Sequence, residues 1–217
     1  MISNSEFVHL HCHTEYSRFD GLAKIDDFTL TAKLMGFPSL AITDHGNVGG
    51  WVKFWQSCKK KKYKIESLTD RSILQTTKVK YKISTNKKGE ETEIELDDAV
   101  LKPIMGEEFY LARDHEKIGK EGNPDGRKGN RHILLLAKNE EGYKNLCTLS
   151  QRSWTHGQYI DPRIDLNLLA EHSKGVICSS ACLGSVINNN LLHGRYDQAK
   201  RVATLLKDIY GEDFYMS

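Results

Sequence analysis

Residues 39–46 read Ser39-Leu40-Ala41-Ile42-Thr43-Asp44-His45-Gly46, an apolar run that ends in Asp-His-Gly. The apolar, partly β-branched part of this run, Ser39–Thr43, predicts a short buried strand. Polar side chains then follow where the strand emerges at its carboxyl end, which is where α/β barrels assemble their active sites. The stretch therefore predicts one strand of the fold and one candidate site beside it.

The residues before and after this strand repeat a strand–helix–strand unit. Phe7–Cys12 is predicted to be a strand, and residues 25–36 a helix with acids in its first turn, a stop at Gly36, and Phe28, Ala32 and Met35 on one face. The other predicted strands are Lys102–Ala112, His132–Ala137, Gly175–Ser179 and Asp213–Met216. The other predicted helices are Glu140–Arg152, with Tyr143, Leu146 and Leu149 inward, and Arg195–Tyr210, with Ala199, Val202, Leu205, Leu206 and Ile209 inward. This alternation indicates an α/β fold with a mostly parallel sheet.

Residues 60–100 break the alternation and are expected to form a peripheral polar insertion. It contains a predicted β-hairpin, in which Val79, Tyr81 and Ile83 alternate on one strand, Asn86–Gly89 turns, and Ile94 and Leu96 alternate back. Its lysines, Lys78, Lys80 and Lys82, are expected to face Glu91, Glu93 and Glu95. The lysine run Lys59–Lys62 is either a solvated surface or a phosphate-contacting patch, and the sequence leaves both interpretations open.

The composition fits one globular domain, because 217 residues with 39% hydrophobic and 28% charged side chains can bury a core. The formal charge of +2 excludes a protein that binds nucleic acid by net charge alone, so any contact with DNA must be local. Five cysteines, an odd number without a CxxC pair, and the lack of a signal-peptide pattern indicate a reducing, cytoplasmic setting. No apolar run is long enough to cross a bilayer, so we expect no membrane partner.

Histidines are concentrated near the N-terminus, in Val8-His9-Leu10-His11-Cys12-His13. The period of a strand places His9, His11 and His13 on one face. Each buried imidazole needs a polar partner, whereas a His-x-His pair is a natural two-ligand clamp for zinc-like ions. The motif therefore predicts metal binding.

Similar polar residues lie in or beside other predicted strands, at Glu107 and Glu108, at His132 and at Cys182. Taken alone, a histidine such as His132 is more often structural, and a cysteine such as Cys182 is more often a small buried apolar residue. Their repetition on successive α/β units indicates one shared metal site.

The motifs resemble the PHP (polymerase and histidinol phosphatase) domain at the N-terminus of bacterial DNA polymerase III alpha subunits. The similar segments are HLHCHTEYSRFDGLAKI, LAITDHGN, PIMGEEFYLA, RHILLLAKNEEGYKNL and SSACLGSVI, which cover nearly all of the chain outside the insertion. The resemblance implies one PHP domain over residues 1–217, folded as a distorted TIM-like barrel of seven β/α units. It also implies a multinuclear metal site that cuts phosphoester bonds.

The resemblance implies seven metal ligands: His11, His13, Asp20, His45, Glu108, His132 and Cys182. Glu107 is the rival of Glu108, but family members place the acid two residues after the glycine, and strand alternation sends Glu107 to the opposite face. Asp44 is expected to support the site as a catalytic residue from outside the ligand set, and Arg18 is a candidate to hold a phosphate.

His9 matches no ligand and is expected to lie deeper in the barrel. The remaining residues of these types are expected to be surface or structural residues: His115, His156, His172, His193, Cys12, Cys58, Cys147 and Cys178.

Imidazole, carboxylate and thiolate together favour two or three zinc or manganese ions, and paired ions suit phosphodiester hydrolysis. The activity expected from the resemblance is a 3′ to 5′ exonuclease, with primer-template DNA, the rest of the polymerase alpha subunit and a separate proofreading exonuclease as partners. The alternatives are an inactive structural or docking domain and a stand-alone phosphatase of the histidinol-phosphatase type.

The chain ends at Ser217, whereas the family completes its metal cluster with an Asp-x-His motif beyond the strand that begins at Asp213. We therefore expect a barrel that lacks its last unit and two of its ligands. Such a chain fits a piece of a longer polymerase, a split or viral polymerase completed by a second chain, or a degenerate scaffold. The polymerase carboxylates would lie further downstream, so these residues alone cannot extend DNA.

Overall fold

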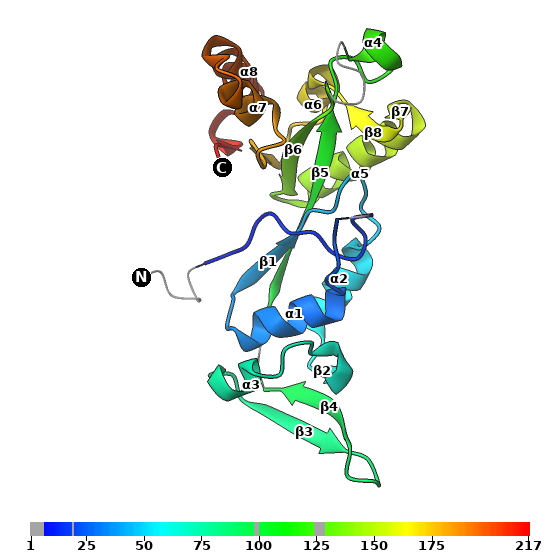
Figure 1. Cartoon of the computed structure of the whole chain (residues 1–217), viewed down its shortest axis with the longest axis vertical. Coiled ribbons are helices and arrows are strands. Elements are labelled where there is room, and N and C mark those ends of the chain that lie inside the picture. The colour runs from blue at the N-terminus through cyan, green and yellow to red at the C-terminus, as the bar shows by residue number, and fades with distance from the viewer. Residues whose placement is uncertain (1–6, 19, 98–99, 124–128) are drawn as a thin grey trace. The chain divides into compact units, whose positions relative to one another are not determined.

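The computed structural model describes residues 7–18, 20–97, 100–123 and 129–217 (Figure 1). Phe19 of the first motif and residues 98–99 at the end of the expected insertion lie outside this description. The chain forms two compact units, which are described separately: unit 1 comprises residues 1–42 and 49–104, and unit 2 comprises residues 43–48 and 105–217. None of the helices within the described ranges combines the length and the apolar character that a bilayer crossing needs.

Unit 1 begins with helix α1 (Ile25–Leu34), which has Asp26 and Asp27 in its first turn. Gly36 ends it with a left-handed backbone, φ 77°, and the Phe37 amide donates to the Ala32 carbonyl at 3.0 Å. The predicted helix and its glycine stop are thus confirmed. The other elements of unit 1 are β1 (Ser39–Ile42), α2 (Trp51–Lys59), β2 (Lys62–Lys64), η1 (Ile65–Ser67), α3 (Ile73–Thr76), β3 (Tyr81–Thr85), β4 (Glu91–Leu96) and the start of β5 (Lys102–Leu111).

The expected strand Phe7–Cys12 is wrong, because the segment has no strand conformation. The Ala41 amide of β1 donates to the His9 carbonyl at 3.0 Å, but Phe7, His9 and Leu10 are exposed, so the segment lacks the alternating burial of a half-buried strand. The His9 ring packs edge-on against Phe37, with 5.3 Å between ring centroids. His9 is therefore a surface residue and not the deeply placed one that the sequence predicted.

The three-stranded sheet of unit 1 has the order β2-β4-β3, and all of its pairs are antiparallel. Ile83 lies opposite Ile94, and Tyr81 opposite Leu96. This face packs on α1 through a shared core (Figure 1), whose buried members are Leu30, Leu34, Tyr63, Ile65, Leu68, Ile94 and Leu96. The other face carries charges, with Lys62, Glu95 and Lys82 on one rung across the three strands.

The buried face of α1 matches the predicted one only in part, because Ala32 is buried as predicted but the helix packs on this sheet through Leu30 and Leu34. Met35, expected on the inner face, is 41% exposed. A hydrophobic period of three to four residues predicts a helix well, but it does not identify which of two neighbouring apolar flanks the tertiary structure covers.

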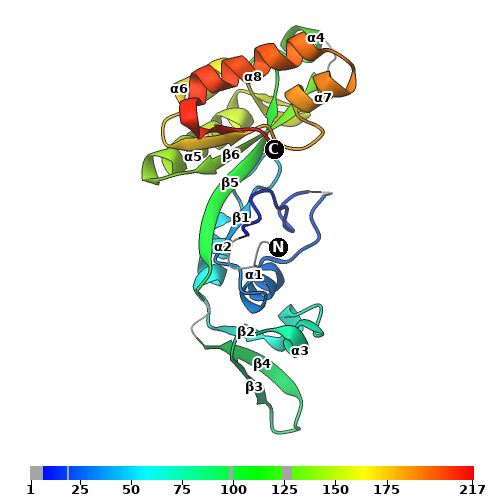
Figure 2. The ribbon, with the colours of Figure 1, turned by 90° about the vertical axis from the view of Figure 1, so that its left-hand side faces the viewer.

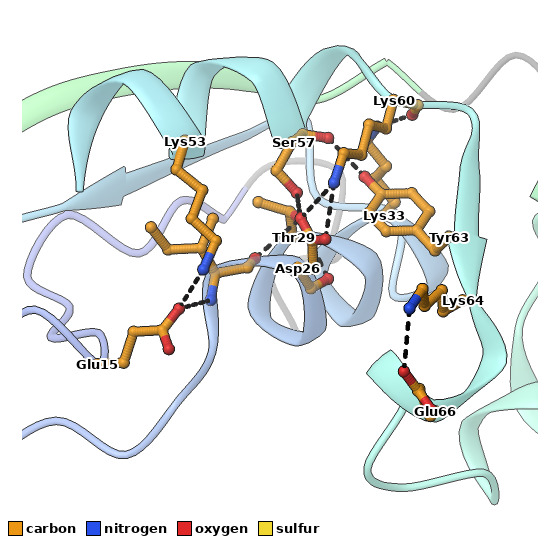
Figure 3. Close-up of polar contacts among 11 residues, drawn as sticks. Glu15, Asp26, Thr29, Lys33, Lys53, Ser57, Lys60, Tyr63, Lys64 and Glu66 are labelled. Carbon is orange, nitrogen blue, oxygen red and sulfur yellow. Dashed lines mark hydrogen bonds and ion pairs between the residues drawn. The ribbon is translucent and has the colours of Figure 1, made fainter.

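A buried lysine joins α1 to the segment after α2 (Figure 3). Lys33 is 2% exposed, and its Nζ donates to the Lys60 carbonyl at 2.6 Å and lies 5.3 Å from the Tyr63 ring centroid. Burial lowers the pKa of Lys33 to about 8. Burial also raises the pKa of Cys58 and that of Tyr63 to about 12. The core of unit 1 thus contains titratable groups whose charged forms folding disfavours.

Unit 2 holds most of a larger sheet with the order β10-β9-β6-β5-β8-β7, and β1 also pairs with β5. The strands are β6 (Arg131–Ala137), β7 (Gln158–Tyr159), β8 (Asp161–Ile164), β9 (Val176–Ser179) and β10 (Phe214–Tyr215). The helices are α4 (Gly119–Gly122), α5 (Glu140–Thr155), α6 (Leu166–Glu171), α7 (Val186–Leu192), α8 (Tyr196–Tyr210) and η3 (Gly211–Asp213).

The larger sheet is mixed, which corrects the expectation of a mostly parallel one. Strand β9 is parallel to β10, and β5 is parallel to β8, but β6 is antiparallel to both β5 and β9. A parallel return needs a crossover of a dozen or more residues, usually with a helix, and the described part of the β5–β6 connection holds only the four-residue helix α4. The α/β class is confirmed, whereas closure into a seven-unit barrel that lacks its last unit stays a prediction.

Strand β8 was not predicted, because its sequence Asp161-Pro162-Arg163-Ile164 is half charged. Arg163 is 1% exposed, and its guanidinium donates to the carbonyls of Gly157 at 2.9 Å, His115 at 3.0 Å and Lys117 at 2.8 Å. Backbone carbonyls from two loops thus satisfy a buried cation that resembles a surface residue in the sequence.

The long helices of unit 2 begin and end close to their predicted limits, but part of their predicted inner faces is exposed. Helix α5 has Asn139 as its N-cap, which accepts the Gly142 amide, and it buries Leu146 and Leu149 but leaves Tyr143 41% exposed. Helix α8 lies beside α7 (Figure 2), and it buries Ala199 and Leu206, while Leu205 is 42% exposed.

Replacing Ile94 by alanine tests the shared core of α1 and the three-stranded sheet. Because Ile94 is fully buried, Ile94→Ala should lower the free energy of unfolding by about 2–4 kcal/mol, as measured by chemical denaturation. Lys82→Ala, on the charged face of the same sheet, should change it by less than about 0.5 kcal/mol. Equal effects of the two substitutions would contradict the packing of this sheet on α1.

Lys33 makes the stability of unit 1 depend on pH. Its folded pKa of about 8 lies below its ordinary value of 10.5, so between these values the unfolded chain holds a proton that the folded chain has lost. The unfolding free energy of wild type relative to Lys33→Met should therefore rise from pH 8 to 10.5, by on the order of 1–3 kcal/mol. Cys58 and Tyr63 act in the opposite direction at high pH and are present in both proteins, but the charge of Lys33 lowers the pKa of Cys58, so the contribution of Cys58 cancels only in part. If the difference in unfolding free energy between wild type and Lys33→Met did not change with pH, the lowered pKa of Lys33 in the folded chain would be contradicted.

Candidate metal centre

Four segments of unit 2 bring together four of the predicted ligands. His45 follows β1 and forms an isolated parallel bridge with Glu108 of β5, in which the Gly46 amide donates to the Glu108 carbonyl at 2.9 Å. His132 lies near the start of β6, and Cys182 follows β9. Backbone pairing therefore determines the position of these side chains before any ligand binds.

Glu108 lies at the centre of this group, with its side chain 1% exposed. Its Oε2 lies 3.2 Å from His45 Nδ1, and its Oε1 lies 2.9 Å from His132 Nδ1. Cys182 Sγ lies 3.5 Å from Glu108 Oε1 and 3.4 Å from His132 Nδ1. Donor atoms of His45, Glu108 and His132 all lie within 4.8 Å of one another, close enough for one metal ion. We call these four residues the Glu108 cluster.

Two aromatic residues that the sequence analysis missed support the Glu108 cluster. The Tyr110 ring lies 5.8 Å from that of His45 and 5.3 Å from that of His132, between centroids. Trp154 of α5 donates its indole N–H to the Gly46 carbonyl at 2.7 Å. Tyr110 could have been found, because strand alternation places it on the same face as Glu108. Trp154 is brought to the site only by the tertiary fold.

Glu107 points to the opposite side of β5. It is fully buried, and the Ser150 hydroxyl of α5 donates to its Oε1 at 3.3 Å. Burial raises the pKa of Glu107 well above its usual value, and the charge of Asp44 raises this pKa further. Asp44 is itself 2% exposed. Glu107 and Glu108 thus have different surroundings, and only Glu108 faces the imidazoles.

The Cys182 loop is attached to β6 by its backbone. The His132 amide donates to the Gly184 carbonyl at 3.2 Å, and the Gly184 amide donates to Cys182 Sγ at 3.4 Å. Ala181 takes an unusual left-handed conformation with φ 60°, which turns the chain out of β9. Burial raises the pKa of the Cys182 thiol, and the charge of Glu108 also raises it. A bound cation would act in the opposite sense.

Unit 1 carries a second cluster, formed by His11, His13 and Asp20, which we call the His13 cluster. His11 Nε2 and His13 Nε2 are 3.2 Å apart. Two imidazole nitrogens on one tetrahedral zinc ion lie about 3.3 Å apart, so this spacing fits a shared ion. His13 Nδ1 lies 3.0 Å from the hydroxyl of buried Ser17, which orients the ring as an outer partner does in metal sites.

Asp20 and Arg18 are exposed residues of the loop that follows His13. A carboxylate oxygen of Asp20 lies within 4.8 Å of a ring nitrogen of His13. The turn is close, since the Asp20 amide donates to the Ser17 carbonyl at 3.1 Å, and a Cβ at Gly21 would lie 1.9 Å from the Thr14 carbonyl oxygen. Only glycine fits at position 21, which explains the Asp-Gly end of the motif.

The other histidines and cysteines lie outside both clusters. His115 is buried, with Nδ1 2.6 Å from Asp165 Oδ2, while His156 and His193 are exposed and His172 is partly buried. Cys58 and Cys178 are buried, and burial raises the pKa of each thiol. Cys12 and Cys147 are partly buried.

Comparisons of the chain with a family model and with known proteins agree on its relatives. The family model described as PHP domain matches residues 9–217. The chain is similar to the DNA polymerase III subunit alpha of Borreliella burgdorferi, at 36% identity over 100% of this chain and 15% of that protein. It is also similar to the DNA polymerase III subunit alpha of Helicobacter pylori strain J99, at 36% identity over 100% of this chain and 15% of that protein. The corresponding subunit of Deinococcus radiodurans is 35% identical over 97% of this chain and 13% of that protein. The chain thus spans about 15% of the length of these relatives.

Gly106, two residues before Glu108, has no room for a side chain. A Cβ there would lie 2.5 Å from Leu136 Cδ2, 2.8 Å from the Leu135 carbonyl oxygen and 2.9 Å from Thr43 Cγ2. Gly106→Ala should therefore destabilise the protein by about 1–3 kcal/mol in thermal or chemical unfolding. Lys102→Ala, at the exposed start of the same strand, is the control and should be nearly neutral. An alanine variant as stable as wild type would contradict the close approach of β5 and β6 at this position.

Proposed function

Because the chain belongs to the PHP domain family, we propose that it is the N-terminal domain of a replicative DNA polymerase III alpha subunit, with a multinuclear metal site for phosphodiester hydrolysis. The observation that carries this proposal is the Glu108 cluster. A fully buried carboxylate lies 2.9 Å from one imidazole and 3.2 Å from another, with a thiol 3.5 Å away. A carboxylate buried beside two imidazoles and a thiol is costly unless a cation binds it.

The donor set fits a metal with intermediate ligand preference. Imidazole and thiolate suit zinc, and the added carboxylates suit manganese, whereas magnesium prefers oxygen ligands alone. The proposed ligands are His11, His13 and Asp20 of unit 1 and His45, Glu108, His132 and Cys182 of unit 2. We propose two or three ions in the complete domain. Family membership and donor chemistry support these ligand assignments.

When bound, the ions would supply Lewis acidity at the phosphoryl oxygen and stabilise the leaving oxygen. The protein's own residues orient the ligands and the substrate. Ser17 orients the His13 ring, and Tyr110 restricts the rings of His45 and His132. Asp44, which is buried and directly precedes His45, is the proposed support of the reaction from outside the ligand set, and the exposed Arg18 is the proposed phosphate contact.

The proposed reaction is 3′ to 5′ exonuclease cleavage of primer-template DNA in the cytoplasm, within a distorted (β/α)7 barrel. The rest of the polymerase alpha subunit, in the same chain or a second one, is the expected partner. A separate proofreading exonuclease is a further candidate partner.

An inactive structural or docking domain is the second candidate function. Three apolar residues around α7 and α8 favour it, because Leu183 is 70% exposed, Leu192 65% and Tyr196 68%. Exposed apolar residues that gather on one pair of helices are typical of interaction surfaces. In this case the chain would bind metal or partner without cleaving DNA.

Metal analysis and cleavage of one protein preparation test these functions together. Protein that contains the complete domain, loaded with zinc or manganese, should retain two or three ions, and it should shorten a 3′-labelled primer in a reaction that EDTA stops. His45→Ala with His132→Ala should lose at least one ion, and cleavage should fall by at least about 100-fold, because ligand loss exceeds the effect of losing an outer partner. His193→Ala, at an exposed histidine, is the control and should match wild type.

The outcomes separate the alternatives. Retained metal without primer cleavage would favour the docking domain, and hydrolysis of histidinol phosphate in preference to the primer would favour the phosphatase. Unchanged cleavage in the double variant would reveal a contaminating nuclease. Metal-free wild type after loading would contradict the site itself.

A further inference from the structure

The outward face of α2 and the strand after it form a basic surface with an exposed aromatic ring. Between Asp44 and Glu66 the chain has six lysines, namely Lys53, Lys59, Lys60, Lys61, Lys62 and Lys64, and no acidic residue. Helix α2 buries Trp51, Phe54, Ser57 and Cys58 and leaves the remaining positions exposed. We propose that this surface, which we call the Trp55 surface, binds single-stranded DNA by base stacking on Trp55 and by phosphate contacts from the lysines around it.

Trp55 provides the stacking platform. It is 45% exposed, and Val52, one turn earlier on the same helix, is 66% exposed. Lys59, one turn later, places its Nζ 3.4 Å from the centroid of the Trp55 ring. A large aromatic ring that folding leaves uncovered, with a cation on its face, has the chemistry by which proteins stack nucleic-acid bases without sequence preference.

The surrounding lysines already have carboxylate partners, but these pairs are exchangeable. Lys60 pairs with Asp26 at 2.7 Å, Lys62 with Glu95 at 3.3 Å and Lys64 with Glu66 at 3.6 Å, and Figure 3 shows the first and the last of these. The three lysine side chains are 42%, 60% and 76% exposed. Exposed pairs contribute about 0–1 kcal/mol, so a phosphate can replace the carboxylate at little cost.

Single-stranded DNA fits this surface better than a duplex. In a duplex the bases are stacked on one another, so their faces are not available to a ring on a convex helix, whereas a single strand presents both bases and phosphates. Charge also favours a polyanion, because the six lysines outnumber the four carboxylates that pair with them among the described residues, Glu15, Asp26, Glu66 and Glu95. The inference is independent of the metal site, since every residue in it belongs to unit 1 and none is a proposed ligand.

Fluorescence anisotropy of fluorescein-labelled dT20 with the full chain in EDTA tests this proposal, because EDTA prevents cleavage and separates binding from nuclease activity. Trp55→Ala should weaken binding at least about fivefold, and Trp55→Phe should retain most of it, since loss of one stacked base costs on this order. Lys59→Gln with Lys61→Gln should lower the slope of log affinity against log salt by about 1.4, at about 0.7 for each lost contact.

The matched control is Lys87→Gln with Lys88→Gln, which removes two charges at the β3–β4 turn. This variant should bind dT20 like wild type. Circular dichroism and the melting temperature of each variant verify folding. Unchanged affinity in Trp55→Ala, an equal loss in the turn variant, or equal affinity for a 20-base-pair duplex would each overturn the proposal, because each means that charge alone attracts the strand.

Discussion

The alternation of side chains along β5 is the constraint on which the candidate site and the surrounding core depend. Strand β5 pairs with β6 and β8 and also with β1, so its backbone cannot shift by one residue without losing these hydrogen bonds. With its register set, Glu108 and Tyr110 face the histidines, while Glu107 faces α5 and Ser150. Two adjacent glutamates thus acquire opposite environments. Gly106 allows this arrangement because β6 approaches too closely for a Cβ.

Both units bury polar groups that a purely structural core would avoid. In unit 2, Glu108 is surrounded by two imidazoles and a thiol, and we attribute this to metal binding. In unit 1, Lys33 lies between a carbonyl and an aromatic ring, and its role is to link α1 to the segment after α2. The difference lies in the partners. Lys33 is satisfied by a carbonyl from its own unit, whereas the Glu108 cluster contains convergent donors suited to a cation.

The residues after α2 combine a structural and a proposed binding role. Their inward side chains, such as Tyr63 and Ile94, complete the core with α1, and this explains why a polar stretch forms ordered strands. Their outward side chains are lysines and glutamates in alternation, which keeps the sheet face solvated. The Trp55 surface combines the outward side chains of α2 with the lysines of this segment, and its six lysines outnumber the four carboxylates that pair with them in the part of the chain that the structure describes.

The sequence by itself determined the α/β class, the strand before His45 and the strands that carry Glu108 and His132, because a period of two residues is a local signal. Strand alternation separated Glu107 from Glu108, and the choice of Glu108 as the proposed ligand rests on the family resemblance. Only the tertiary structure decided the mixed direction of the larger sheet, the exposed position of His9 and the buried strand that carries Arg163. Strand direction depends on which distant residues pair, and the burial of a charge depends on carbonyls from other loops. Neither property is encoded within a window of neighbouring residues, and for the same reason the support from Trp154 became visible only when the chain was folded.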